Sequence, residues 1–292
     1  MLEDDAESTH GYIEHTLEQV TRNELGEAIR PLRPLGANSQ GVDAFLQGEV
    51  PYTSGQLYLP VQNRLTRYPI PTLRLPQSAG DRLLDIGFNW GRWSIAAARS
   101  GYRPVGIDPS VDAILAARRV FKQLDVRVDF IVGDARFLPF RGGSCDNVYS
   151  YGVFQHLSKA NTRLGMAEIR RVFRDRGRSL VQMPNKYGVR QHQQSRRRGF
   201  TEGEGFEVRY WSPPEMLSAF RQLIGPSDVS ADCFFGLGIQ LSDIDLLPRR
   251  YRAVVRASHG LASASRRCRP LRMCADSLYV ASIRSPAQEI FQ

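Results

Sequence analysis

The sequence predicts an α/β protein built on a doubly wound, mostly parallel sheet of seven strands. Short apolar runs alternate with longer amphipathic runs across the middle of the chain, from residue 82 to residue 183. A tight glycine-containing turn joins the first of these runs to a helical stretch, and the next apolar run ends in an acid. Because strands and helices alternate, we expect helices on both faces of the sheet.

The elements are expected in a regular order along the chain. Strands are expected at 82–86, 103–108, 126–132, 145–150 and 178–183, and helices at 91–100, 110–123 and 160–174. A later helix should begin at Ser212, because a serine cap precedes two prolines and Glu215. Two further strands are expected, at 231–235 and 277–283.

The regions flanking this core predict a cap. Residues 8–30 have apolar side chains at helical spacing and precede Pro31 and Pro34, whereas 31–81 are expected to be mostly irregular and to cross the mouth of the site. Residues 185–210 form a polar stretch rich in glycine and arginine, too long for a simple connection. The expected organisation therefore has three parts, an N-terminal cap segment, a core domain with substrate-side insertions at 185–275, and a tail: 1–81, 82–284 and 285–292.

The turn after the first strand excludes a pyrophosphate ligand. A dinucleotide-binding turn reads G-x-G-x-x-G, and its second glycine lets the backbone approach the pyrophosphate. Here Asn89 and Arg92 hold the second and third positions, and bulky Trp90 lies between them. The acid at the end of the second strand, Asp108, follows Gly87 by 21 residues, which is the usual place for a carboxylate that binds a ribose.

A series of motifs in a fixed order identifies a family resemblance. The turn matches D-x-G-x-G-x-G with Asn89 as the middle residue, and it is followed by GDA, then LPF, then CDNV, then a helix and a turn ending at Gly177. This segment, 82–185, resembles class I S-adenosylmethionine-dependent methyltransferases, in particular those of ubiquinone and menaquinone biosynthesis. Cys145 stands where phenylalanine is common, and RDRG at 174–177 replaces the usual K-P-G-G.

The resemblance implies a Rossmann-like fold, S-adenosylmethionine as the cofactor, and roles for several residues. It implies that Asp108 binds the ribose, Asp134 the adenine amino group with the backbone of Ala135 beside the ring, and Asp85 the methionine amino group. The Asn89 amide could reach the methionine carboxylate. Asp85 could instead cap the turn, and Asp134 could be only a turn residue. The full expected set of cofactor residues is Asp85, Gly87, Asn89, Gly91, Asp108, Asp134, Ala135 and Ser150.

Acceptor-side residues are expected after the fourth and fifth strands, because open α/β sheets bind ligands at the carboxyl ends of their strands. His156 is the only histidine within the core motifs and is a candidate general base, although a histidine at the start of a helix is often structural. Candidate substrate contacts are Asn185, Tyr187, Arg209, Tyr210 and Trp211. No metal is required, and the four cysteines form no C-x-x-C pair.

Composition leaves the acceptor open. The net charge is +9, and arginine clusters at 196–198 and 266–272 could line an anionic substrate or touch a polyanion or a membrane surface. No RNA-binding module or N-P-P-Y-type tetrapeptide is visible, so nucleic acid is possible but not favoured. No apolar run reaches the length of a membrane helix and the N-terminus is acidic, which predicts a cytoplasmic protein.

The expected function is methyl transfer to a small or medium-sized acceptor, such as a metabolite, a glycan intermediate or a lipid-linked intermediate. An RNA- or protein-modifying methyltransferase and a cofactor-binding partner protein without catalysis are the alternatives. The turn makes an NAD-dependent oxidoreductase the least favoured class. The sequence does not indicate an oligomeric state.

Overall fold

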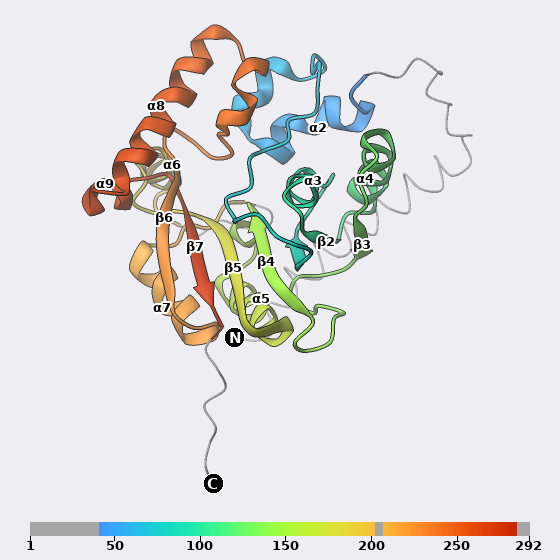
Figure 1. The fold of residues 1–292 in the computed structure, drawn as a ribbon. Coiled ribbons are helices and arrows are strands. Elements are labelled where there is room, and N and C mark those ends of the chain that lie inside the picture. The colour runs from blue at the N-terminus through green and yellow to red at the C-terminus, as the bar shows by residue number, and fades with distance from the viewer. Residues whose placement is uncertain (1–40, 202–206, 285–292) are drawn as a thin grey trace.

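A seven-stranded sheet forms the centre of the molecule in the computed structural model, which describes residues 41–201 and 207–284. Its strand order is β3-β2-β1-β4-β5-β7-β6 (Figure 1). Strands β1 to β5 pair in parallel, whereas β7 runs antiparallel to both β5 and β6. The predicted α/β fold with a mostly parallel seven-stranded sheet is therefore confirmed.

The strands are β1 (Arg82–Ile86), β2 (Arg103–Asp108), β3 (Asp129–Val132), β4 (Cys145–Tyr151), β5 (Phe173–Pro184), β6 (Ser227–Cys233) and β7 (Ser277–Ile283). The α-helices are α2 (Ala44–Ser54), α3 (Arg92–Arg99), α4 (Val111–Leu124), α5 (Lys159–Val172), α6 (Val189–Arg197), α7 (Pro213–Leu223), α8 (Arg249–Ser265) and α9 (Arg269–Met273). Three short 3-10 helices are also described, η1 (Gln56–Val61), η2 (Phe154–His156) and η3 (Leu241–Leu246).

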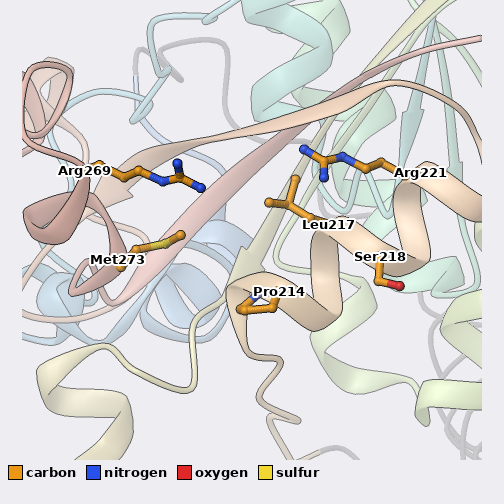
Figure 2. Close-up of a pocket in the computed structure, with 6 residues that line it drawn as sticks. All are labelled: Pro214, Leu217, Ser218, Arg221, Arg269 and Met273. Atoms are coloured by element: carbon orange, nitrogen blue, oxygen red, sulfur yellow. The ribbon is translucent and has the colours of Figure 1, made fainter.

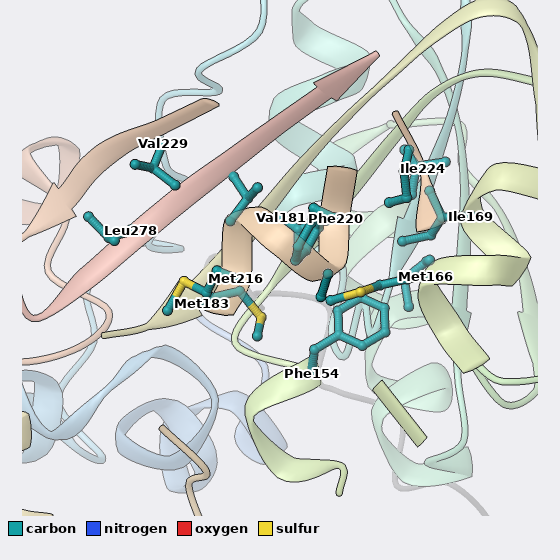
Figure 3. Packing of buried hydrophobic residues seen from close by; sticks show 14 of the residues in the cluster. Phe154, Met166, Ile169, Val181, Met183, Met216, Phe220, Ile224, Val229 and Leu278 are labelled. Carbon is teal, nitrogen blue, oxygen red and sulfur yellow. The ribbon is translucent and has the colours of Figure 1, made fainter. Parts of the chain in front are cut away.

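Neighbouring residues of the central strands are buried on opposite faces of the sheet. On one face, Val181 packs with Met166 of α5 and Phe220 of α7 (Figure 3). Val148 belongs to the same cluster. On the other face, the residue next to Val148, Tyr149, packs with side chains of α3. Both faces are therefore covered, which is why the strand sequences are nearly continuous apolar runs.

Helix α6 is a departure from the expected irregular stretch at 185–210. Its first turn is capped by a distant carboxylate, because Asp276 Oδ1 accepts the backbone N–H groups of Arg190 at 2.8 Å and Gln191 at 3.3 Å. The buried side chains of this helix are the polar Gln191 and Ser195. The expectation of an irregular segment was wrong here. The sequence hides the helix, because the capping residue Asp276 lies 86 residues away and the apolar periodicity of a helix is missing.

The segment before β1 is also more helical than predicted. Helix α2 begins after Asp43, whose side chain accepts the Phe45 N–H, and it contains Pro51 in its second half. Strand β6 begins at Ser227 and not at residue 231, because alternate residues of its first half, Asp228 and Ser230, are exposed and hide the strand pattern. The expected helix at 8–30 and the tail at 285–292 lie outside the described residues.

Two distant segments meet above the sheet at the end where the parallel strands terminate. Gly55, between α2 and η1, lies against the backbone of Leu237 and Gly238, which follow β6. In Figure 1, α2 and α8 lie beyond the end of the sheet from which β7 points away. Within the described ranges, no helix combines the length and apolar character needed to span a membrane.

Candidate functional site

The carboxyl ends of β1, β2 and β4 are joined by hydrogen bonds into one continuous edge. Gly87 N–H donates to the Ile107 carbonyl at 2.7 Å, and the Ser150 hydroxyl donates to the Ile86 carbonyl at 3.1 Å. Gly133 N–H, just after β3, donates to the Asp108 carbonyl at 3.1 Å. The structure thus gathers the ends of four strands, with most of the predicted cofactor residues, at a single edge.

The turn between β1 and α3 uses three left-handed residues. Gly87 has φ +69°, and a Cβ there would lie 2.1 Å from Val153 Cγ2. Gly91 has φ +85°, and a Cβ would lie 2.3 Å from the Phe121 ring. Asn89 has φ +49°, and its Oδ1 accepts the Trp90 N–H at 2.8 Å. Asparagine tolerates this conformation, so it can replace the middle glycine of the motif.

Asp108 presents a carboxylate at the tip of β2. Its Oδ2 accepts the Asn89 N–H and its Oδ1 accepts the Ser110 N–H, both at 2.9 Å. Burial raises the pKa of Asp108 to about 6. A carboxylate offers about four acceptor positions, so roughly two remain for hydroxyl donors. The geometry therefore suits a vicinal diol such as a ribose.

Asp85 lies on the α3 side of the same edge. Its side chain is buried, and Oδ2 accepts the Ser94 hydroxyl at 2.7 Å. The pKa of Asp85 is raised to about 7, chiefly by burial, while the Ser94 hydrogen bond lowers it and the nearby Asp108 raises it. A cationic amino group near Asp85 would favour its ionised form.

Asp134 already has a cationic partner. Arg136 Nη2 lies 2.6 Å from its Oδ2, and Arg136 Nε lies 3.0 Å from its Oδ1. Ala135 is partly buried against the α5 side of the core. An adenine amino group would therefore have to share the Asp134 carboxylate with Arg136.

His156 and Arg209 are brought together, although they are 53 residues apart. Arg209 Nη1 donates to the His156 carbonyl at 2.8 Å, and Arg209 N–H donates to the Gln155 carbonyl at 2.8 Å. The imidazole is partly buried, with Nε2 3.0 Å from the Gln155 side-chain amide nitrogen. The predicted base thus follows β4 as expected, with one ring nitrogen beside a neighbouring amide.

The remaining predicted substrate contacts divide into buried and exposed residues. Asn185 is fully buried, and its amide donates to the carbonyls of Met273 and Ala275 at 2.7 and 2.8 Å. Trp211 is fully buried beside it, joined by a backbone bridge. Tyr187 is 53% exposed, and Tyr210 is partly exposed beside Arg198. Asn185 and Trp211 therefore fasten the end of β5, whereas the two tyrosines are accessible to a ligand.

One buried cluster near the turn has no counterpart in the sequence analysis. Arg92, the first residue of α3, makes an ion pair with Asp243 of η3 at 3.2 Å. Tyr58 of η1 donates its hydroxyl to the same Asp243 oxygen, and burial raises the pKa of Tyr58. We call Tyr58, Arg92 and Asp243 the cap cluster. Among the described residues, Arg92 Nε is buried and has no hydrogen-bond partner.

A second polar cluster was also missed, at the ends of β4 and β6. Tyr151 donates its hydroxyl to Asp232 Oδ2 at 2.9 Å, and Ser277 donates to the same oxygen at 2.8 Å. Gln240 donates its amide to the Tyr151 hydroxyl at 3.0 Å, and Arg74 lies 3.4 Å from Asp232 Oδ1. Burial raises the pKa of Asp232, against the lowering effect of Arg74. No local pattern signals such contacts, because the partners lie far apart in the sequence.

Comparison with known proteins supports the predicted class. Residues 83–177 match the family model of a methyltransferase domain. The chain is 38% identical over 94 residues to a probable fatty acid methyltransferase of Pseudomonas putida, covering 31% of this chain and 24% of that protein. It is 36% identical over 104 residues to a demethylmenaquinone methyltransferase of Clavibacter sepedonicus, covering 35% and 41%. It is 32% identical over 130 residues to a tRNA U34 carboxymethyltransferase of Alcanivorax borkumensis, covering 41% and 39%.

The fold extends beyond the matched segment. A chain from the solved complex between the Haloferax volcanii Trm112 methyltransferase activator and a methyltransferase superposes with a TM-score of 0.50 at 20% identity, covering 83% of this chain and 94% of that chain. The chain spans less than half the length of the curated relatives that it matches. Residues 83–177 therefore belong to a methyltransferase domain of the S-adenosylmethionine-dependent class, set in a Rossmann-like sheet.

Proposed function

We propose that the protein transfers a methyl group from S-adenosylmethionine to a small or medium-sized acceptor, such as a metabolite or a glycan- or lipid-linked intermediate. The observation that carries this proposal is Asp108, whose buried carboxylate is held by two backbone N–H groups at the tip of β2 and keeps acceptor capacity for a diol. When bound, the cofactor supplies an electrophilic methyl on a sulfonium.

The chain's residues fit this cofactor at its ribose and its amino-acid tail. Asp108 would hold the ribose hydroxyls, and Asp85 would face the methionine amino group, with Ser94 fixing its orientation. Gly87 and Gly91 adopt the left-handed conformations that the turn requires, and the Asn89 side chain accepts the Trp90 N–H. Ser150 ties β4 to β1 below the site. For the adenine amino group, Asp134 and the Ala135 backbone would act together with Arg136.

The cap favours an acceptor of limited size. The α2–η1 segment and the segment after β6 meet over the strand ends, joined through Gly55 and through the cap cluster. Such a cover would exclude water and align the acceptor with the methyl group, which are the main requirements of this reaction. Tyr187 and Tyr210 are the accessible candidates for acceptor contacts.

Calorimetry with the whole chain tests the cofactor assignment. We expect saturable binding of S-adenosylhomocysteine and no binding of NAD. An acceptor screen that measures S-adenosylhomocysteine release then tests the activity. Saturable NAD binding without a response to S-adenosylhomocysteine would overturn the proposal. Binding without release for any acceptor would favour a partner protein without catalysis.

His156 is the proposed general base for a hydroxyl acceptor. General-base assistance typically contributes about 10² to 10⁴ in rate. Replacing His156 by alanine should lower turnover at least tenfold and leave cofactor affinity nearly intact. Because Arg209 Nη1 donates to the backbone carbonyl of His156, this hydrogen bond should survive the substitution. Normal turnover in the variant would leave alignment alone as the mechanism.

An RNA acceptor is the second candidate. It is favoured by the tRNA-modifying relative and by the arginine-rich stretch 249–272. Binding that weakens steeply with added salt would support it, since phosphate contacts release counterions, whereas binding of a small neutral acceptor should depend little on salt.

A further inference from the structure

A pocket lies at the edge of the molecule formed by α7, α9 and β6. Its volume is about 480 Å³, and Figure 2 shows the six residues that line it, Pro214, Leu217, Ser218, Arg221, Arg269 and Met273. A hollow of about 250 Å³ shares Leu217, Arg221, Arg269 and Met273 with it and adds Asp228, Val229 and Arg272. We propose that this pocket binds a phosphate monoester attached to an apolar chain.

The polar side of the pocket consists of Arg221 and Arg269, together with Arg272 of the adjoining hollow. In Figure 2 the guanidinium groups of Arg221 and Arg269 extend toward each other from α7 and α9. Arg221 is held in place because it donates to the Ser227 carbonyl at 3.2 and 3.1 Å. Arg272 Nη1 donates to the Val229 carbonyl at 2.9 Å, while its Nε is buried without a hydrogen-bond partner among the described residues. Two guanidinium groups are thus preorganised, with donors left over.

The positive charge of the lining favours an anion. Residues 246–275 contain eight arginines and no aspartate or glutamate, and two of these arginines, Arg269 and Arg272, line the two hollows. The nearby acid is Asp228, whose side chain is 81% exposed and 3.9 Å from Arg272 Nη1. Like charges gathered around one cavity repel each other, and a bound anion removes this repulsion. In the described part of the chain, Arg269 has no hydrogen bond or ion pair of its own, so it can turn to a ligand.

The chemistry of the lining selects the ligand class. Guanidinium groups bind phosphate through pairs of parallel hydrogen bonds, and a monoester carries up to two negative charges against the three arginines. A single carboxylate would neutralise less of this charge. Leu217, Met273 and Val229 form an apolar wall beside the arginines, which suits an alkyl or isoprenoid chain.

The pocket is separate from the proposed cofactor site. Strand β6 is one edge of the sheet, whereas β2, which ends at Asp108, and β3, which precedes Asp134, lie at the opposite side. The inference therefore goes beyond methyl transfer, and binding at the pocket can be measured whether or not the cofactor binds. The phosphate could belong to a soluble metabolite or to a lipid headgroup.

Titration calorimetry of the full chain with hexyl phosphate and with inorganic phosphate tests the proposal. We expect hexyl phosphate to bind at least about tenfold more tightly, because its methylenes are buried against Leu217 and Met273. Replacing Arg269 by alanine should weaken hexyl phosphate binding at least about tenfold. The matched control is Arg249→Ala, an exposed arginine in the same charged stretch outside the pocket, and it should change the affinity less than about twofold.

If the Arg269 and Arg249 variants lost the same affinity for hexyl phosphate, the proposed site would be overturned, because the net charge alone would explain the binding. Equal affinity for hexyl phosphate and inorganic phosphate, or no binding of either, would overturn it as well. Sedimentation with vesicles then separates the two sources. Binding to phosphatidic acid but not to phosphatidylcholine, lost in Arg269→Ala and kept in Arg249→Ala, would identify a lipid headgroup. Hexyl phosphate binding without vesicle binding would identify a soluble metabolite.

Discussion

The two halves of the strand edge are built in different ways. On the β1–β3 side, Asp108 is held by backbone N–H groups of residues within 19 positions of it. On the cap side, Tyr58 and Asp243 meet across 185 positions, through side chains alone. Backbone geometry follows from a short local motif, whereas side-chain contacts of this range follow from the packing of the whole chain. The residues of the cofactor side can therefore be predicted from a single sequence, whereas the contacts of the cap side cannot.

The same difference predicts where each half is sensitive. A backbone-held carboxylate can lose its side chain while the loop keeps its shape, so the loss should appear in ligand binding. A buried ion pair that loses one partner leaves an uncompensated charge, so the loss should appear in stability. Four substitutions or titrations test this contrast.

The largest effect is expected in the cap cluster. Replacing Asp243 by alanine should lower the free energy of unfolding by about 3 to 5 kcal/mol, because Arg92 stays buried without its carboxylate. Urea unfolding followed by circular dichroism measures the loss. Asp245→Ala, an exposed acid of the same 3-10 helix, should change stability by less than about 0.5 kcal/mol. A similar loss of unfolding free energy in both variants would contradict the stabilising role of the cap cluster.

The next effect concerns ligand binding. Asp108→Ala should weaken S-adenosylhomocysteine binding by roughly tenfold to more than a hundredfold, because charge-assisted hydrogen bonds to the ribose are lost. The fold should change little. Calorimetry measures the dissociation constant, and Asp112→Ala, an acid in the first turn of α4, controls for the loss of charge. A folded Asp108 variant with an unchanged dissociation constant would remove this residue from the site.

The pH dependence of binding is expected to be smaller. The pKa of Asp108 is raised to about 6 by burial, so its carboxylate protonates as pH falls below 6 and loses capacity to accept hydroxyls. Affinity for S-adenosylhomocysteine should therefore fall from pH 8 to pH 5. If one proton blocks binding, the fall is at most about tenfold for each pH unit below the pKa. Asp85, with its pKa raised to about 7, acts in the same direction. Asp108→Asn should flatten the lower part of this profile, and a profile of unchanged slope would contradict the assignment.

The smallest effect concerns the turn itself. Asn89→Gly should change the free energy of unfolding by less than about 1 kcal/mol, since glycine accepts the left-handed conformation but loses the hydrogen bond to Trp90. Asn89→Ala should destabilise by about 1 to 2 kcal/mol, because alanine loses the bond and strains the backbone. Thermal unfolding of both variants would show which of the two is less stable. An alanine variant as stable as the glycine variant would mean that the turn does not constrain this residue.

Strand bounds show how far sequence alone reaches. Strands β1, β2 and β7 begin and end where the apolar runs predicted, because buried strands have nearly continuous apolar sequence. The start of β6 was misplaced because its first residues alternate with exposed polar ones. Helix α6 was missed because its capping carboxylate, Asp276, comes from the start of β7.

The candidate site divides in the same manner. Asp85, Gly87, Asp108 and Ser150 lie at the expected edge, because each follows from a position on a predicted strand or turn. Their contacts with cofactor stay predictions. Asn185 and Trp211 were selected for their place after β5. The sequence could not show that the Asn185 amide donates to two carbonyl groups, one at the end of α9 and one just before β7.

The position of β7 also has a consequence for the order in which the sheet forms. Among the residues that the structure describes, strand β6 pairs only with β7, and β7 is inserted between β6 and β5 (Figure 1). During synthesis, β6 therefore has no ladder partner until residues 277–283 have emerged, although β1 to β5 can already pair with one another. The outer edge of the sheet and the basic helices attached to it should complete folding last, and they should be the first part to open when the native protein is probed by hydrogen exchange.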